Sequence, residues 1–241
     1  MIKKYEMNYE YFKITERTAL NPDNVVMIRL RSVNKISFQS GDLISITPKG
    51  YTNPRIYSIG KLGKDILLSV KWNPNGICSS YLCSSKVGDT IQGIVKNNAR
   101  FHFPKNVSSV CYVSDCTGIV PYLGYVNENH ETPLKLIWGG KTESSFEHYR
   151  EVLENTPSLR KKIYYELAFS ECNRKKYVQE ILLKHQIQVA KDLKKGGVFM
   201  LCGSEIMKYS VLDTLEEITN KHLLKPLCQF QANGQIVANC Y

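Results

Sequence analysis

The chain has 241 residues, 43% of them hydrophobic and 22% charged, which is enough for one large domain or two ordinary ones. No apolar stretch approaches the roughly 20 residues that span a bilayer, and no apolar run follows the lysines of the N-terminal MIKKYEMNYEYFKI. Stable membrane insertion and a signal peptide are therefore not expected. The formal net charge of +10 suits an acidic partner, but charge alone does not distinguish nucleic acid, an anionic membrane and an acidic protein.

The eight cysteines contain no CxxC pair, so neither a zinc ribbon nor an iron–sulfur cluster is expected, and no metal site is predicted. Because no signal peptide accompanies them, we expect reduced thiols and a cytoplasmic protein.

The first part of the chain, residues 1–105, has the pattern of a small antiparallel β-barrel. Short apolar segments rich in β-branched residues alternate with turn residues. The segments expected as strands are VVMIRLRS (25–32), DLISITP (42–48), PRIYSIG (54–60), DILLSVKW (65–72) and DTIQGIV (89–95).

Residues 106–241 alternate between strand and helix patterns, which predicts a doubly wound α/β domain with a parallel sheet. The expected strands are VCYVS (110–114), LKLIWG (134–139), KIYYELAFS (162–170), VFMLCG (198–203) and GQIVANCY (234–241). The expected helices cover residues 121–129, 145–153, 174–185 and 205–219. Such sheets bind ligands at the carboxyl ends of their strands, which makes the loops after Ser114, Gly139, Ser170 and Gly203 the candidate sites.

Two motifs in the first domain have the chemistry of a phosphate and ring site. RIYS (55–58) combines an arginine fork, an aromatic face and a hydroxyl, and strand alternation places Arg55 and Tyr57 on one face. GICSSYL (76–82) is a glycine-led helix start whose free backbone N–H groups favour a diphosphate. Each motif taken singly also fits an ordinary barrel strand or a plain helix cap.

A third motif, DCTGIVPY (115–122), follows the first strand of the second domain, where a doubly wound sheet binds the pyrophosphate of a dinucleotide. Thr117 and Gly118 open the turn, and Pro121 suits the first turn of the helix. The segment is not a GxGxxG fingerprint.

Taken in order, these segments resemble the ferredoxin–NADP reductase superfamily across nearly the whole chain. RIYS is similar to the Arg-x-Tyr-Ser flavin motif of this superfamily, and TGIVPY to its Thr-Gly-x-x-Pro-aromatic motif. GICSSYL is similar to its Gly-x-x-Ser motif, in a form closest to that of the diflavin reductases such as the sulfite reductase flavoprotein. Five further segments fit the family pattern: SGDLISITP (40–48), WGGK (138–141), FSECNRKKYVQ (169–179), LCGS (201–204) and the terminal GQIVANCY.

The resemblance implies an enzyme that binds FAD in the barrel. Arg55 would pair with the FAD pyrophosphate, Tyr57 would stack on the isoalloxazine ring, and Ser58 would lie beside the hydride-accepting nitrogen. The backbone N–H groups of Gly76, Cys78 and Ser79 would complete the pyrophosphate cradle. Tyr241 would cover the other face of the ring.

The resemblance also implies an NADPH site in the second domain, with Cys202 beside the nicotinamide. Ser58, Cys202 and Tyr241 are the expected catalytic residues. The expected nicotinamide-cofactor residues are Thr117, Gly118, Lys141, Ser170, Arg174, Lys175, Tyr177, Gln179 and Gly203.

Three positions depart from the family pattern. Glu171 stands where NADPH-dependent members place an arginine, so NADH remains possible, although the net charge of residues 170–179 favours the phosphate of NADPH. Asn239 replaces a frequent carboxylate, which bears on proton delivery near the flavin. Ser114 and Cys116 replace the first glycines of the pyrophosphate loop.

A chain of 241 residues has no room for the flavodoxin-like module of the diflavin enzymes, so FMN is not expected and the one-electron carrier is expected to be a separate protein. An acidic flavodoxin or ferredoxin fits the charge of +10. The alternatives are a free-flavin or ferric reductase, the reductase component of an oxygenase-type system, or, from another class, a basic nucleic-acid-binding barrel without a chromophore.

Overall fold

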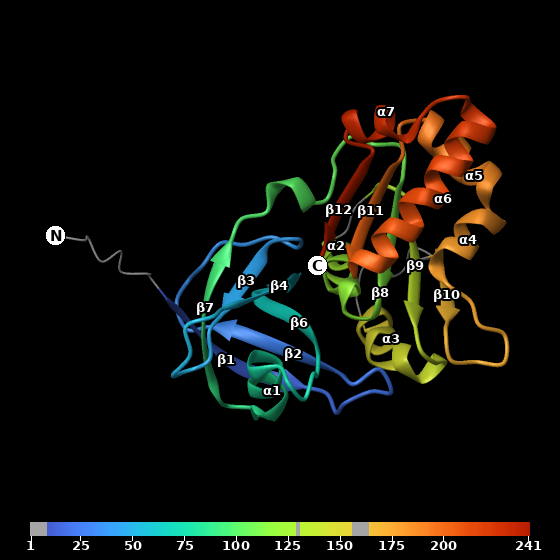
Figure 1. Ribbon diagram of the computed structural model, residues 1–241. Helices are drawn as coiled ribbons and strands as arrows, with labels where there is room; N and C mark the ends of the chain where they lie inside the picture. The colour runs from blue at the N-terminus through green and yellow to red at the C-terminus, as the bar shows by residue number, and fades with distance from the viewer. Residues whose placement is uncertain (1–8, 129–130, 156–163) are drawn as a thin grey trace.

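The computed structural model describes residues 9–128, 131–155 and 164–241, which form two sheets packed side by side (Figure 1). The first sheet has seven antiparallel strands in the order β4-β3-β7-β1-β2-β6-β5, and the second has five parallel strands in the order β10-β9-β8-β11-β12. The predicted fold class, an antiparallel flavin-type barrel followed by a doubly wound α/β domain, is confirmed. Within the described ranges, no helix is both long and apolar enough to cross a bilayer.

The barrel closes around its own apolar core because alternate residues of its strands point inward. Phe12 and Ile14 of β1 and Ile28 and Leu30 of β2 are fully buried there. The helix α1 covers this core with Cys78 and Leu82. The elements are β1 (Glu10–Arg17), β2 (Val25–Ser32), β3 (Leu43–Ile46), β4 (Arg55–Ser58), β5 (Gly60–Leu62), β6 (Asp65–Lys71), α1 (Ile77–Ser84), β7 (Thr90–Lys96) and the 3-10 turn η1 (Ala99–Phe101).

The parallel sheet has a point at which the chain changes direction across it. The chain runs from β8 outward through β9 to β10 and then returns to β11 and β12 on the other side of β8. The strands are β8 (Val110–Asp115), β9 (Leu134–Gly140), β10 (Tyr164–Phe169), β11 (Val198–Gly203) and β12 (Ile236–Cys240). In sheets of this kind the crevice for a ligand lies outside the carboxyl ends of the strands at this switch, here β8 and β11.

Strand alternation divides the second domain into two cores. Tyr112 of β8, Met200 and Cys202 of β11 face the barrel, whereas Cys111 and Val113 face the opposite side. On the barrel side lie η2 (Cys116–Ile119), α2 (Val120–Asn127), η3 (Glu143–Phe146) and α3 (Glu147–Glu154). On the other side lie α4 (Val178–Lys184), α5 (Gln186–Lys194), α6 (Glu205–Leu223) and α7 (Leu227–Ala232), of which α4 to α6 form the outer layer in Figure 1.

Two glycines let α2 pack directly against barrel backbone. A Cβ at Gly60 of β5 would lie 2.3 Å from the carbonyl oxygen of Val120, and one at Gly124 of α2 would lie 2.6 Å from the backbone nitrogen of Lys61. Met27 and Leu67 of the barrel join the core on this side. These contacts fix the barrel beside the carboxyl ends of β8 and β11.

The structure corrects several predicted elements. The helix expected over residues 174–185 begins only at Val178, because Tyr177 has extended backbone (φ −119°) and acts as the N-cap with Glu180. The strand β1 and the helices α5 and α7 were not predicted. Residues 129, 162 and 163, at the ends of two predicted elements, lie outside the described residues.

Candidate functional site

The strand β4 presents the RIYS motif at the edge of the barrel sheet, next to β3. Arg55 is exposed, and its side chain donates to the carbonyl oxygen of Pro54 at 3.3 Å. Tyr57 is half-buried near the thiol of Cys78, and burial raises the pKa of Tyr57 well above its ordinary value. Burial also raises the pKa of Cys78, while the positive charge of Arg55 opposes the rise. Arg55, Tyr57 and Cys78 therefore lie together, as the motifs predict.

The N-terminus of α1 leaves backbone donors free. The first turn of a helix has no intrahelical acceptors, so the N–H groups of Ile77, Cys78 and Ser79 are available to a ligand. The hydroxyl of Ser79 folds back onto the carbonyl oxygens of Asn73 and Gly76 at 3.2 and 3.0 Å, so Ser79 offers its backbone rather than its side chain. A Cβ at Gly76 would lie 2.5 Å from Ser79 Oγ, which explains the glycine.

A cavity of about 740 Å³ adjoins the same helix end. Its walls include two aromatic side chains from neighbouring loops, Tyr51 and Trp72, together with Gly76 and Ile77. Both aromatics are more than a third exposed, so each offers a free ring face. Neither was predicted as a site residue, because a single aromatic in a turn carries no motif.

Ser58 is the point at which the two domains meet in the site. Its Oγ accepts from the side-chain amide of Asn239 at 2.7 Å and lies 3.8 Å from the Cys202 thiol. Ser58 and Cys202 are both buried. Burial raises the pKa of Cys202 to about 12, so the thiol is neutral at physiological pH. β4 and β11, which are 144 residues apart at these positions, thus bring together two of the predicted catalytic residues.

Tyr241 completes this cluster from the end of β12. Its backbone N–H donates to the carbonyl oxygen of Gly203 at 3.0 Å. Burial of its hydroxyl raises its pKa above the ordinary value, and side-chain bonds to Ser58 and Thr117 oppose the rise. The residue as a whole is 57% exposed.

A second cavity, about 580 Å³, opens at the carboxyl ends of the parallel strands. It contains four of the predicted cofactor residues: Lys141, Ser170, Tyr177 and Gln179. Residues from the loops after β8 and β11 also line it, among them Cys116 and Ser204. This is the crevice at the topological switch, where a dinucleotide binds in such sheets.

The loops after β8 and β11 pack too closely for any side chain at two glycines. A Cβ at Gly118 would lie 1.9 Å from the carbonyl oxygen of Cys202, and one at Gly203 (φ +152°) would lie 2.2 Å from Asp115 Oδ1. Ser204 donates its backbone N–H to Asp115 at 3.1 Å. Burial raises the pKa of Asp115, and the bonds from Ser204 oppose this rise. Gly118 and Gly203 therefore shape the cavity floor without lining it.

At the other end of this cavity, Lys141 and Glu171 form an ion pair. Lys141 Nζ and Glu171 Oε1 are 3.1 Å apart, and this contact raises the pKa of Lys141. The loop after β10 brings Lys176 to the cavity, whereas Arg174 and Lys175 are exposed and do not line it. Of the expected cofactor residues, Arg174 and Lys175 therefore lie outside the lining of this cavity.

The barrel also contributes two residues to this cavity that the sequence did not indicate, Asp23 and Lys71. Asn21 holds the turn that carries Asp23 by accepting the N–H groups of Asp23 and Val25 at 3.0 and 2.9 Å. The Asp23 carboxylate accepts the backbone N–H of Lys141 at 3.2 Å. Sequence reasoning identified the turn but had no signal that it reaches the second domain.

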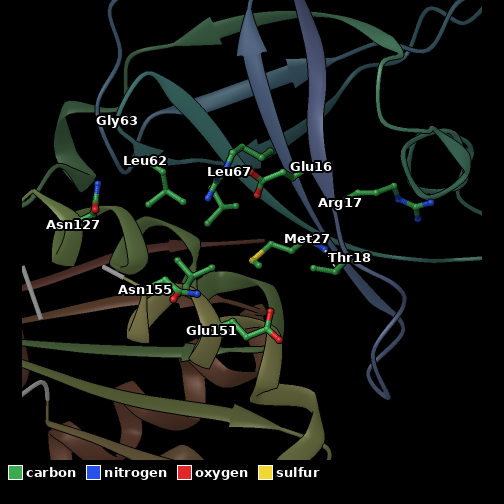
Figure 2. A pocket seen from close by; sticks show the side chains of 12 residues that line it. Glu16, Arg17, Thr18, Met27, Leu62, Gly63, Leu67, Asn127, Glu151 and Asn155 are labelled. Atoms are coloured by element: carbon green, nitrogen blue, oxygen red, sulfur yellow. Dashed lines mark hydrogen bonds and ion pairs between the residues drawn. The ribbon is translucent and has the colours of Figure 1, made fainter. Parts of the chain in front are cut away.

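A further cavity, about 600 Å³, lies between the barrel and α2 and α3 (Figure 2). Figure 2 shows Met27, Leu62 and Leu67 on the barrel side, facing Asn127 and Asn155 on the other. None of the predicted site residues lines this cavity. It is therefore separate from the cluster at Ser58.

Comparison with curated proteins finds relatives that are flavoprotein reductases. No family profile matches the chain. It is 30% identical over 162 residues to NADPH–cytochrome P450 reductase of Dictyostelium discoideum, 28% over 155 residues to the sulfite reductase [NADPH] flavoprotein alpha-component of Bacillus subtilis, and 27% over 166 residues to the root isozyme 2 of chloroplastic ferredoxin–NADP reductase of Arabidopsis thaliana. Each match covers 61% of this chain, but only 24%, 26% and 43% of the respective relatives.

Among solved structures, ferredoxin–NADP⁺ reductase from Plasmodium falciparum superposes with a TM-score of 0.76 at 18% identity, covering 97% of both chains. A variant of that enzyme, solved in complex with 2′P-AMP, superposes with a TM-score of 0.75. The structural likeness establishes the fold over the whole chain, and the sequence matches connect the chain to the reductases. The chain therefore has the fold of the ferredoxin–NADP⁺ reductases and is similar in sequence to reductases of that superfamily.

Proposed function

We propose that this protein is an FAD-dependent oxidoreductase that transfers electrons between NADPH and a separate one-electron carrier. The observation that carries the proposal is the cluster of Ser58, Cys202, Asn239 and Tyr241, which joins the RIYS strand to the end of the dinucleotide cavity. A hydride donor and its acceptor must approach within about 3–3.5 Å of each other. This distance requires the flavin site and the nicotinamide site to adjoin, as they would at this cluster.

The residues around β4 and α1 fit FAD. Arg55 has an exposed guanidinium that bonds only through Nη1 to its neighbour Pro54 among the described residues, and the first turn of α1 offers three backbone N–H groups. Together these groups suit a pyrophosphate. Tyr57 supplies an aromatic face next to Ser58. Tyr51 and Trp72 line the adjoining cavity and would hold a second flat ring. When bound, FAD would supply the conversion between two-electron and one-electron transfer.

Around the reacting centre, the chain supplies alignment rather than acid–base groups. Asn239 fixes Ser58 through the 2.7 Å bond to its Oγ. Cys202 stays neutral because its pKa is raised to about 12, so it introduces no charge. A small, soft thiol at this position permits close approach of the nicotinamide. Tyr241, which follows β12 beside Gly203, would shield the same region from water.

The cavity at the carboxyl ends of β8 to β11 fits the rest of NADPH. Gly118 and Gly203 shape the part nearest Cys202, where the pyrophosphate would lie beside Thr117. Lys141, Ser170, Tyr177 and Gln179 line the far part, where the adenosine would lie. Lys176 faces this part, and Arg174 and Lys175 add positive charge around its entrance.

An acidic carrier, a ferredoxin or a flavodoxin, is the proposed electron acceptor. The net charge of +10 supports this choice because opposite charges speed the encounter of two proteins. The proposed location is the cytoplasm, where the eight cysteines would stay reduced.

The test is to purify the protein and measure bound flavin, then to reduce that flavin with NADPH without oxygen. A yellow protein that releases FAD, is reduced by NADPH and then reduces a ferredoxin or flavodoxin would agree with the proposal. Arg55→Ala should weaken FAD binding by about ten- to a hundredfold, because a charge-assisted pair contributes about 1.5–3 kcal/mol. Arg55→Lys keeps the positive charge but loses the two-pronged guanidinium, so its affinity for FAD should lie between those of the wild type and Arg55→Ala. A colourless protein with no affinity for FAD would refute the function.

A further inference from the structure

Lys141 and Glu171 are held opposite each other by backbone that continues the sheet beyond its strands. Ser170 N–H donates to the carbonyl oxygen of Gly140 at 3.0 Å, and Glu171 N–H donates to that of Lys141 at 2.9 Å. These bonds extend the parallel pairing of β9 and β10, which fixes Lys141 and Glu171 on neighbouring chains. The 3.1 Å ion pair is therefore a consequence of the sheet register.

The ion pair lies at the end of the cavity remote from the reacting centre. Glu171 follows β10, and Tyr241 follows β12, at opposite ends of the five-stranded order. Four strand spacings separate them, which is about 19 Å at about 4.8 Å per spacing. A dinucleotide with its nicotinamide near Cys202 would place its adenosine ribose near β9 and β10.

The charged residues that line the cavity balance. Within the part of the chain that the structure describes, three carboxylates and three lysines line it: Asp23, Asp115, Glu171, Lys71, Lys141 and Lys176. The excess of positive charge in residues 170–179 comes from Arg174 and Lys175, which do not line the cavity. A phosphate therefore enters a cavity of no net lining charge, in which Lys141 already has a partner.

We propose that Glu171 is a specificity-determining residue that competes with the 2′-phosphate of NADPH for Lys141. This inference rests on the proposed function. The phosphate must displace the Glu171 carboxylate before Lys141 can bind it, so Glu171 reduces the preference for a phosphorylated ribose without abolishing it. The displacement is feasible because the pair is open to solvent, with side-chain exposures of 37% for Lys141 and 58% for Glu171.

The test compares 2′P-AMP with 5′-AMP, which differ only in the 2′-phosphate, by calorimetric titration at low ionic strength. Glu171→Gln should tighten 2′P-AMP binding about three- to tenfold, because it frees Lys141 and removes a repelling charge. The same substitution should change the affinity for 5′-AMP by no more than about twofold. Glu16→Gln is the matched control, since Glu16 forms a similar ion pair with Arg29 (2.7 Å, 63% exposed) outside this cavity. The control changes the net charge equally and should alter neither affinity.

A second pair of variants tests whether Glu171 acts through Lys141. Lys141→Gln should weaken 2′P-AMP binding about tenfold or more, since a charge-assisted bond to phosphate is lost. When Lys141→Gln is already present, adding Glu171→Gln should tighten 2′P-AMP binding by less than half as much, in free energy, as it does when Lys141 is intact. An equal effect with and without Lys141 would mean that Glu171 only repels the phosphate. That result would overturn the proposal that Glu171 and the phosphate compete for Lys141.

The outcomes separate this inference from the function on which it rests. If the wild type binds both nucleotides and Glu171→Gln behaves like Glu16→Gln, Glu171 does not set specificity, while the proposed function stands. If no variant binds either nucleotide, both the inference and the NADPH site are refuted.

Discussion

Asn239 stands 2.7 Å from Ser58 Oγ, at a position where a carboxylate would form a titrating pair with the hydroxyl. An amide does not titrate, and the neighbouring Cys202 thiol has its pKa raised to about 12. Between about pH 6 and pH 9, neither side chain changes its charge. Under the proposed function, the limiting rate of flavin reduction at saturating NADPH should therefore be independent of pH across this range.

Asn239→Asp should introduce a pH dependence at this site. Burial raises the pKa of a carboxyl above its usual value near 4, so the new group titrates closer to the working range. Above that pKa its negative charge opposes reduction of the flavin, and we expect the rate to fall about three- to tenfold. Below it, the protonated form should recover a rate near that of the wild type. Stopped-flow reduction from about pH 5 to pH 9 measures this; a flat profile for Asn239→Asp would contradict the placement of Asn239.

Among the elements, the close contact of η2 with the end of β11 leaves no room for a methyl group. A Cβ at Gly118 would lie 1.9 Å from the backbone carbonyl oxygen of Cys202. This overlap cannot be relieved by moving β11, because β11 is paired with β8 in the sheet. Gly118→Ala should lower the free energy of unfolding by about 1–3 kcal/mol and shift the urea midpoint downward at unchanged slope. The control is Gly93→Ala, where the nearest atom is 3.2 Å away. Equal losses in both variants would contradict the proposed cause.

The strand β10 carries a carboxylate whose ionisation links stability to pH. Burial alone would raise the pKa of Glu166, but hydrogen bonds from His185 and Lys135 lower it to about 2. The carboxylate lies 2.8 Å from His185 Nε2 and forms ion pairs of 3.1 Å with Lys135 and 3.5 Å with Lys184. Because the folded pKa lies below the unfolded one, the stabilisation is complete above about pH 4.5 and is lost as the pH falls towards 2.

Glu166→Gln should therefore remove part of this acid sensitivity. Solvent reaches Lys184, which is 61% exposed, so we discount the contribution of Glu166 to about 1 kcal/mol. Denaturant titrations of both proteins at several pH values test this. The stability difference should favour the wild type at neutral pH and shrink by about that amount between about pH 4.5 and pH 2. A difference that does not vary with pH would show that Glu166 has no shifted pKa.

At the scale of the whole molecule, the net charge of +10 should govern the encounter with the proposed carrier. Exposed charges are screened over about 8–10 Å at ordinary ionic strength, so added salt should slow the reduction of an acidic ferredoxin or flavodoxin. A small neutral acceptor serves as the control and should be insensitive to salt. A salt response that is equal for both acceptors would mean that steering by charge plays no part.

Much of the fold could be predicted from local patterns. Short apolar runs in β2, β6 and β8 indicated strands, and nearly every residue of these runs is buried. The strand β1 escaped notice because only Phe12 and Ile14 of EYFKITER are fully buried. Arg174, Lys175 and Lys176 suggested an earlier start for the helix α4. The helix begins at Val178 instead, because Tyr177 and Glu180 cap its N-terminus.

The amino-acid sequence by itself determined the architecture of a barrel followed by a parallel α/β sheet, because periodicity and turn chemistry are local properties of the chain. The expected flavin and dinucleotide residues came from its resemblance to a known superfamily. Only the tertiary structure decided which of these residues meet. Ser58 contacts Asn239 across 181 positions, and Lys141 contacts Asp23 across 118. The ion pair of Lys141 with Glu171 depends on the register between β9 and β10, and the exclusion of Arg174 and Lys175 from the cavity depends on the path of one loop. Such contacts are set by packing between segments distant in the chain, and no local pattern contains that information.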